Sequence, residues 1–261
     1  MPIYLAISPE EADGFHPQSH PLAYLGHRLD PNAPAILCPE LTPQPGAWMV
    51  LQDDVVPSYA PTLSLAQCAA QYAASQYHGL ICDLDQPAND FWCAFLQYLG
   101  AICQQMQLPL CVPAAYAGFV PGALVAVGSD LSGGSFADRM QEVAAKYPHR
   151  AVLELRPMSA DFSLPCPDGS GRPVPLEERL QLQQRHAVPD FLAEDLKCRY
   201  FSYDVEDSLH ILLFDTRETL EAKLSCAEAA GFAATIGLLQ ELRCTQATQI
   251  REISPPAGLT K

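Results

Sequence analysis

The chain has 261 residues, 49% of them hydrophobic, and a formal net charge of −15. A surface with this acidic excess repels polyanions and anionic lipid, which excludes nucleic acid and membranes as partners. The start, MPIYLAIS, lacks the basic region of a signal peptide, and no run of about 18 apolar residues occurs. The acidic balance therefore favours neutral or cationic partners, or serves solubility alone, and the sequence predicts a cytoplasmic protein.

The ten cysteines favour free thiols in a reducing compartment. They form no C-x-x-C pair and no Cys/His spacing typical of zinc. Six of them fall inside apolar helix or strand patterns: Cys68, Cys82, Cys93, Cys103, Cys111 and Cys226. A metal site using His16, His20 and His27 is an alternative without supporting spacing, so we expect no metal and no cofactor.

Apolar runs rich in β-branched residues alternate along the chain with longer helical patterns. The runs predict strands at 3–8, 47–53, 79–85, 108–113, 123–129, 151–156, 210–215 and 235–241, with weaker candidates at 22–25 and 36–38. Helices are predicted at 63–77, 89–106, 135–146 and 219–230. This alternation indicates a parallel sheet, and about eight strands in a chain of this length favour a (β/α)8 TIM-like barrel over a doubly wound sheet.

Two regions interrupt this rhythm. Residues 9–46 and 157–200 are rich in proline and turn-forming residues, and we expect them to be irregular insertions in a single domain. The barrel domain is then 1–244, followed by a polar C-terminal tail, 245–261. Two helix starts support the parse: Ser135 with Asp138, and Thr216 with Thr219 before a helix that ends at Gly231.

Acidic residues recur where the predicted strands end, and parallel strands of a barrel all end on one face. These residues are Asp53, Asp54, Asp83, Asp85, Glu154, Asp215 and Glu241, with Asp54 taken as the site candidate of the first pair. Asp83 and Asp85 are two positions apart, so on one strand they share a face, and their repulsion would raise one pKa as a general acid requires. The sequence thus predicts an acidic pocket holding Asp83, Asp85, Glu154 and Asp215, with Glu154 neutralised either by Arg156 or by a group on a neighbouring strand. The alternative is a set of separate, hydrated strand ends.

Residues 78–85, His-Gly-Leu-Ile-Cys-Asp-Leu-Asp, resemble the DGxDxDxE motif on the fourth strand of glycoside hydrolase family 18, the chitinase-like barrels. Gly79 matches the family's glycine, Asp83 the aspartate that orients the substrate's N-acetyl group, and Asp85 the catalytic glutamate. The stretch 210–242 is similar to the family's last βαβ unit. The resemblance implies action on, or recognition of, glycans containing N-acetylglucosamine, so the expected partner is an oligosaccharide or another neutral small molecule. Asp85 would protonate the leaving oxygen while Asp83 holds the N-acetyl group. Further sugar contacts would come from Asp54, Tyr116, Glu154, Asp215 and Glu241.

The positions at which the sequence departs from the motif lead to an alternative to glycoside hydrolysis. His78 and Ile81 replace two aspartates, and Asp85 is one methylene shorter than glutamate. The third strand reads Val-Leu-Gln-Asp where the family has Ser-x-Gly-Gly, and the last strand ends in Gln-Glu in place of tryptophan. The second interpretation is therefore a catalytically inactive sugar-binding or interaction module on a decayed glycosidase barrel.

A third interpretation is an enzyme acting on a phosphorylated metabolite. Gly133 and Gly134 precede the helix that starts near Ser135, and free N–H groups there could bind phosphate. A simple turn with an N-cap explains the same residues, and the acidic net charge disfavours an anionic ligand. The chain has no G-x-G-x-x-G, Walker A or G-x-S-x-G motif.

Overall fold

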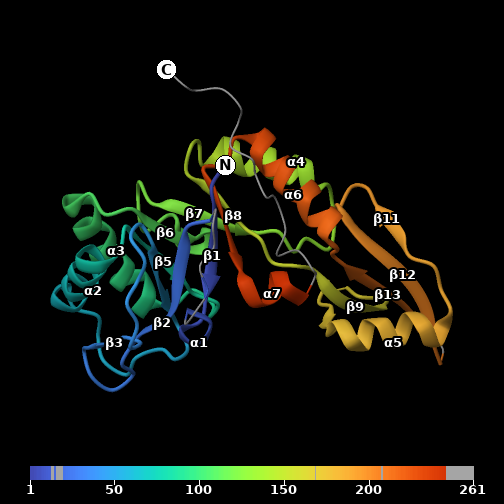
Figure 1. Ribbon diagram of the computed structural model, residues 1–261, viewed down its shortest axis with the longest axis horizontal. Coiled ribbons are helices and arrows are strands. Elements are labelled where there is room, and N and C mark those ends of the chain that lie inside the picture. Colours follow the sequence, from blue (N-terminus) through green and yellow to red (C-terminus); the bar gives the residue numbers. More distant parts are fainter. Residues whose placement is uncertain (13–14, 16–19, 168, 207, 245–261) are drawn as a thin grey trace. The chain divides into compact units, whose positions relative to one another are not determined.

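The computed structural model describes residues 1–12, 15, 20–167, 169–206 and 208–244 (Figure 1). The expected tail, 245–261, lies outside the described residues. The chain forms two compact units. The first contains 1–127, 147–152 and 232–236, and the second contains the described parts of 128–146, 153–231 and 237–244.

Eight parallel strands close into a barrel in the order β1-β14-β8-β7-β6-β5-β4-β2, with β2 pairing back onto β1. The barrel strands are β1 (Ile3–Ile7), β2 (Leu22–Leu29), β4 (Trp48–Gln52), β5 (Gly79–Asp83), β6 (Leu110–Pro113), β7 (Leu124–Gly128), β8 (Ala151–Glu154) and β14 (Ala234–Leu238). A short β3 (Ile36–Leu37) pairs antiparallel with β2 at the outside. The predicted TIM-like barrel is confirmed, and because the sheet closes on itself it is not doubly wound.

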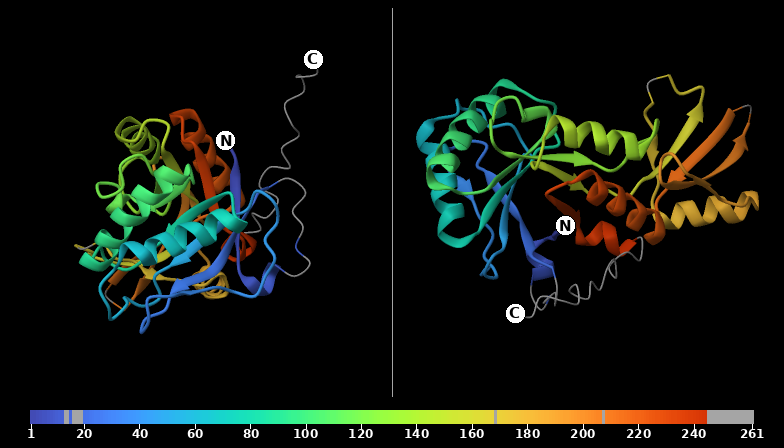
Figure 2. Two further views of the ribbon diagram at one scale, coloured as in Figure 1. Left: turned by 90° about the vertical axis from the view of Figure 1, so that its left-hand side faces the viewer. Right: turned by 90° about the horizontal axis from the view of Figure 1, so that it is seen from above.

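The helices α2 (Leu63–Gln76) and α3 (Asp90–Met106) of the first unit pack against each other (Figure 2). Each begins at a residue that caps it: Thr62 Oγ1 accepts the N–H of Leu65, and Asn89 Oδ1 accepts the N–H of Trp92. Their buried positions recur at helical spacing, small on α2 and aromatic on α3. The unit also contains α1 (Pro9–Ala12) and the 3-10 turn Ala114–Tyr116.

The second unit contains an antiparallel sheet in the order β10-β9-β13-β12-β11. Its strands are β9 (Ser159–Leu164), β10 (Arg172–Pro173), β11 (Phe191–Ala193), β12 (Cys198–Val205) and β13 (Ser208–Phe214). Helix α5 (Leu176–His186) lies along one face (Figure 1), where its Leu182 packs against a buried cluster that includes Phe201 and Leu212. Much of the segment expected to be irregular is therefore regular sheet and helix.

One strand assignment from the sequence is wrong. Residues 210–215 were expected to form a barrel strand, but they belong to β13, which pairs antiparallel with both β9 and β12. The weaker candidate at 22–25 supplies the eighth barrel strand as part of β2. A short apolar run has the same composition in either kind of sheet, so the run alone cannot identify its partner.

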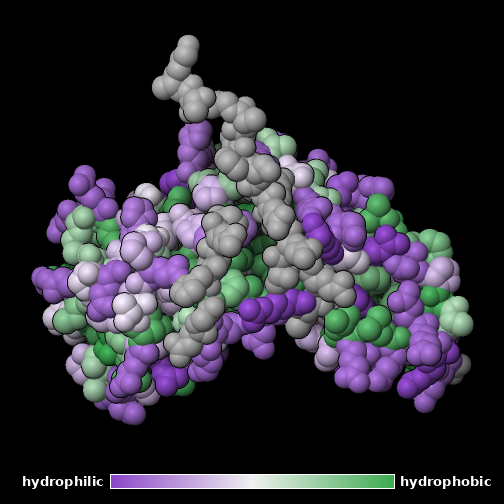
Figure 3. All heavy atoms as spheres, in the orientation of Figure 1, coloured by the Kyte–Doolittle hydropathy of each residue, from purple (hydrophilic) through white to green (hydrophobic). Residues whose placement is uncertain are grey.

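The remaining helices of the second unit are α4 (Phe136–Lys146), α6 (Arg217–Ala230) and α7 (Leu239–Cys244). The predicted helix starts are confirmed: Ser135 Oγ accepts the N–H of Asp138, and Thr216 with Thr219 forms a capping box. Gly231 ends α6 with a φ of 86°. Among the described residues no helix is long and apolar enough to cross a bilayer. The face in Figure 3 is mostly hydrophilic, with smaller hydrophobic groups.

Candidate functional site

The ends of β4 and β5 bring several polar groups of the first unit together. Gln52 and Asp83 are the last residues of these strands and are partners in the parallel register. Gln52 Nε2 donates to Asp83 Oδ2 over 3.4 Å, while Gln52 Oε1 accepts the backbone N–H of Gly26 on β2 at 3.0 Å. Asp83 is half-buried: its carboxylate is bound by Gln52, yet part of the residue remains exposed at the carboxyl end of β5.

Asp85 lies beyond the end of β5 and is exposed. The expectation that the strand continues to residue 85 is wrong, so alternation along a strand does not set the direction of this side chain. Its place is set through the backbone. The N–H of Asp85 and the N–H of Gln86 each donate to the carboxylate of Asp53, one to each oxygen, both at 3.0 Å.

Asp53 is the residue that binds the backbone after β5, whereas the sequence analysis chose its neighbour Asp54 as a site residue. It is only 6% exposed. Burial raises the pKa of its carboxyl above the usual value, and the two backbone N–H donors counteract this rise. Asp54 is instead exposed and forms a 2.9 Å ion pair with Arg28. Of two adjacent aspartates, the one that points inward is the one that organises the strand ends.

Gly79 starts β5 against the indole of Trp48. A Cβ at this position would lie 2.8 Å from the ring atoms, closer than carbon atoms approach. Glycine here is therefore required by the close approach of an aromatic side chain. This gives a packing reason for the glycine on which the family resemblance partly depends.

Tyr116 follows β6 in the 3-10 turn and is 1% exposed. Burial raises the pKa of its phenol, and the nearby charge of Asp53 adds to the rise. The ring therefore lies in the interior near Asp53 and does not present a face to solvent. As a sugar-stacking platform it would need a change of conformation.

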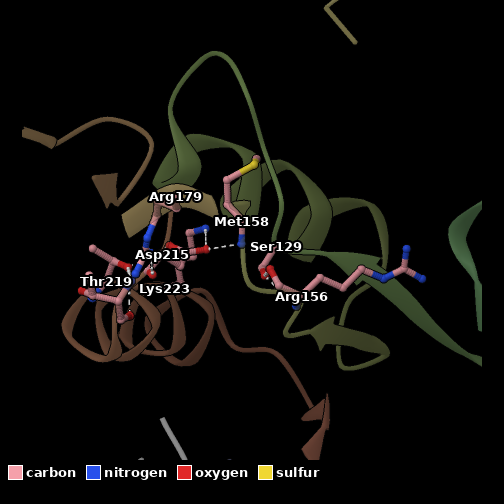
Figure 4. A network of polar contacts seen from close by, with 8 residues as sticks. Ser129, Arg156, Met158, Arg179, Asp215, Thr219 and Lys223 are labelled. Carbon is pink, nitrogen blue, oxygen red and sulfur yellow. Dashed lines mark hydrogen bonds and ion pairs between the residues drawn. The ribbon is translucent and has the colours of Figure 1, made fainter. Parts of the chain in front are cut away.

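Glu154 ends β8 and belongs to the second unit. Its carboxylate is 2.6 Å from the guanidinium of Arg156, the neutralising partner expected from the sequence. Next to this pair, Ser129 Oγ donates to the carbonyl of Arg156 and accepts its N–H, at 2.9 and 3.0 Å (Figure 4). These bonds tie the segment after β7 to the segment after β8.

Asp215 does not end a barrel strand, because it follows β13 of the antiparallel sheet. Its carboxylate accepts bonds from Lys223 Nζ at 2.7 Å, Thr219 Oγ1 at 2.8 Å and the N–H of Met158 at 2.7 Å (Figure 4). Burial raises its pKa, and the Lys223 ammonium opposes this. The side chain has no exposed surface. The expected acidic pocket therefore does not include Asp215, which is enclosed by its own partners.

In the second unit the expectation for Glu241 is wrong, whereas the simple turn with an N-cap expected at Gly133 and Gly134 is confirmed. Glu241 was placed at the end of the last strand, but β14 ends at Leu238 and Glu241 is exposed on α7. The backbone turns into a helix three residues earlier than the apolar run indicates. Gly133 and Gly134 form the turn before α4, and Ser135 caps that helix itself. The N-terminus of α4 thus has an internal partner.

His27, a candidate metal ligand on β2, is fully buried, and its ring contacts that of Tyr72 on α2. Its Nδ1 contacts the carbonyl of Tyr24 at 3.2 Å and its Nε2 contacts Tyr77 Oη at 3.0 Å. Within the described ranges no group of three His, Cys, Asp or Glu side chains could hold a metal ion. Nine cysteines are described and all are free thiols, although Cys68 is exposed on α2 and not in the core.

The barrel with this arrangement of strand ends has the fold of chitinase-like glycoside hydrolases. No family model matches the chain, and no curated protein matches it by sequence. Among solved structures, the chitinase of Chromobacterium violaceum matches with a TM-score of 0.61 and 15% identity over 96% of this chain and 99% of that one.

Two other structures extend the comparison. The spore cortex-lytic enzyme SleL of Bacillus cereus has a TM-score of 0.59 and 12% identity, over 95% of this chain and 74% of that one. A plant class V chitinase mutant from Cycas revoluta, in complex with (GlcNAc)3, has a TM-score of 0.59 and 12% identity, over 95% and 98% of the two chains. At these identities the comparisons show a shared fold, which confirms the resemblance at that level.

Proposed function

We propose that this protein recognises glycans containing N-acetylglucosamine at the carboxyl ends of β4 and β5. The observation that carries this proposal is the pair Asp83 and Asp85, which is held by Gln52 and Asp53 at the end of the fourth barrel strand. A sugar presents hydroxyl and amide donors, and carboxylates fixed in place accept bonds from them. The solved structures that share the fold include a chitinase mutant with (GlcNAc)3 bound.

Asp83 and Asp85 have separate roles in this proposal. Asp83 is oriented through its side chain, which suits a contact with the N-acetyl group of the sugar. Asp85 is exposed, and its backbone N–H is bound to Asp53, so we propose that its carboxylate contacts an oxygen of the neighbouring sugar unit. Asp54, exposed beside Arg28, would contact the sugar at the edge. Glu154 and Glu241 belong to the second unit, and their contact with sugar is an extension of the same proposal.

Hydrolysis is the second candidate, because the exposed Asp85 stands in the sequence where the motif that it resembles has its catalytic glutamate. Asp85 would protonate the leaving oxygen while Asp83 holds the N-acetyl group that attacks the sugar carbon. An aspartate reaches about 1.5 Å less far than the glutamate of the motif. A displacement of that size lowers the rate of such chemistry strongly. We therefore place recognition before turnover.

The test is a calorimetric titration with (GlcNAc)4, together with a turnover assay on the same oligomer, for wild type, Asp83→Asn and Asp85→Asn. Recognition predicts binding by wild type and a loss of about tenfold or more in each variant, since each removes a charge-assisted bond. Glu142→Gln on α4 is the control for a lost surface charge. No binding by wild type rejects the proposal. Turnover that is equal in wild type and Asp85→Asn removes Asp85 from any mechanism.

A cytoplasmic location is part of the proposal, since all described cysteines are free thiols. Fractionation of the cells that make the protein tests it, and recovery from the medium would contradict it.

A further inference from the structure

The carboxyl end of β4 lacks the Ser-x-Gly-Gly of the chitinase-like family. Gln52, the last residue of β4, and Asp53, which follows it, nevertheless both form hydrogen bonds with residues at the end of β5. We propose that Gln52 and Asp53 are positioning residues that jointly fix the Asp83 and Asp85 pair, Gln52 through a side chain and Asp53 through the backbone. The inference rests on the proposed function for its purpose, but the contacts it uses are independent of any ligand.

The Gln52 side chain is oriented by the neighbouring strand on its other side. The backbone N–H of Gly26 can only donate, so the atom of Gln52 that faces it at 3.0 Å is the amide oxygen. The amide nitrogen therefore faces Asp83, at 3.4 Å from Oδ2. The Gly26 N–H is available because the register of β2 with β4 shifts between Tyr24 and His27, where Gly26 has a φ of 90°.

Asp53 acts on the backbone that follows β5. Its two oxygens accept two consecutive N–H groups, those of Asp85 and Gln86, both at 3.0 Å. Bonds to an ionised acceptor are roughly twice as strong as neutral ones, and this acceptor is only 6% exposed. Fixing two successive peptide groups fixes the direction in which the Asp85 side chain leaves the chain. Asp53 thus acts on the exposed Asp85 carboxylate indirectly, through the backbone that carries it.

The adjacent aspartate provides a matched comparison. Asp54 carries the same charge one residue later, but it is exposed and pairs with Arg28, which is itself 54% exposed. A general effect of negative charge at the end of β4 would be shared by both residues. Of these two aspartates, only Asp53 has the contacts for a positioning role.

The first experiment measures amide hydrogen exchange of Asp85 and Gln86 in the full chain without ligand. Asp53→Ala should speed exchange of both amides roughly 10- to 100-fold, the equivalent of lost bonds to a charged acceptor. Asp53→Asn keeps one acceptor oxygen and should release one amide more than the other. Asp54→Ala should leave both rates unchanged. The Leu80 amide, bonded to the carbonyl of Pro109 just before β6, reports whether β5 itself has opened.

The second experiment measures (GlcNAc)4 affinity of the same variants and of Gln52→Glu, which still accepts from Gly26 but cannot donate to Asp83. We expect affinity to fall about tenfold in Gln52→Glu and Asp53→Ala, and less in Asp53→Asn. Failure of wild type to bind rejects the proposed function, while the amide rates still decide the role of Asp53. Unchanged amide rates in Asp53→Ala overturn the inference. The inference is also overturned if wild type binds (GlcNAc)4 and Asp53→Ala speeds amide exchange without lowering the affinity.

Discussion

The carboxylate of Asp215 lies 2.7 Å from the ammonium of Lys223, and neither side chain has any exposed surface. Thr219 and the N–H of Met158 complete the set of donors around the carboxylate. The pair joins the end of β13 to the interior face of α6. A charge pair enclosed in this way is compensated only as a pair, so loss of either partner leaves an uncompensated buried charge.

Replacing Lys223 by Ala should therefore lower the free energy of unfolding by about 3–5 kcal/mol. The double variant Asp215→Leu, Lys223→Met should recover much of this loss, because two apolar side chains need no charge partner. Urea unfolding with a constant m-value measures both. Arg217→Gln removes the exposed 2.9 Å pair with Glu221 on the same helix and should cost less than about 1 kcal/mol. A similar cost for Lys223→Ala and Arg217→Gln would contradict the argument.

His27 should make stability fall in mild acid. Burial lowers the pKa of its imidazole from 6.5 to about 4. Between these values the unfolded chain binds a proton that the folded protein does not, so the free energy of unfolding falls as the pH falls from 6.5 to 4. The full effect is about 3 kcal/mol. His27→Gln should flatten this part of the stability profile measured by urea unfolding, whereas His149→Asn, at an exposed histidine, should not. If wild type and His27→Gln show the same dependence of stability on pH, His27 is not the group whose protonation lowers the free energy of unfolding.

Gly79→Ala should destabilise the first unit by about 1–3 kcal/mol, since the new methyl group meets the Trp48 ring at 2.8 Å and the barrel interior must shift. Gly118→Ala is the matched control, because no atom lies within 4 Å of its added Cβ. It should be neutral or slightly stabilising. Thermal and urea unfolding measure both variants. Equal midpoints for the two would show that the indole moves aside freely.

Much of the barrel is readable from the sequence because its strands are compact apolar runs at regular spacing. The runs at 47–53, 79–85 and 151–156 all became barrel strands. The antiparallel sheet was hidden because β9 has only two buried residues, so its pattern is too weak to indicate a strand. Without β9 as its visible partner, the run at 210–215 read as one more barrel strand.

The sequence predicts those parts of the candidate site that depend only on where a strand ends and on which side of it a residue lies. Asp83 follows from the strand end and its parity. The role of Asp53 could not be predicted, because the N–H groups it binds belong to residues 85 and 86, on a different strand end. Lys223 was likewise missed as the partner of Asp215. The two residues are eight positions apart, one after a strand and one in the next helix, and their separation in space depends on the turn between these elements. Contacts of this kind are properties of the folded chain.

Tyr116 was expected to contact sugar, and its burial leads to a different expectation. With 1% of its surface exposed, the ring should contribute mainly to packing. Tyr116→Ala should then lower the free energy of unfolding by about 3–5 kcal/mol. Tyr116→Phe keeps the ring and removes only the hydroxyl near Asp53, so it should change stability by less than about 1.5 kcal/mol. Titration with (GlcNAc)4 supplies the second measurement. For Tyr116→Phe we expect affinity within about threefold of wild type, since a shift of 0.7 kcal/mol or less corresponds to that factor. A loss of affinity greater than tenfold, at unchanged stability, would show that the hydroxyl reaches the sugar and that the ring moves toward the strand ends when the ligand binds.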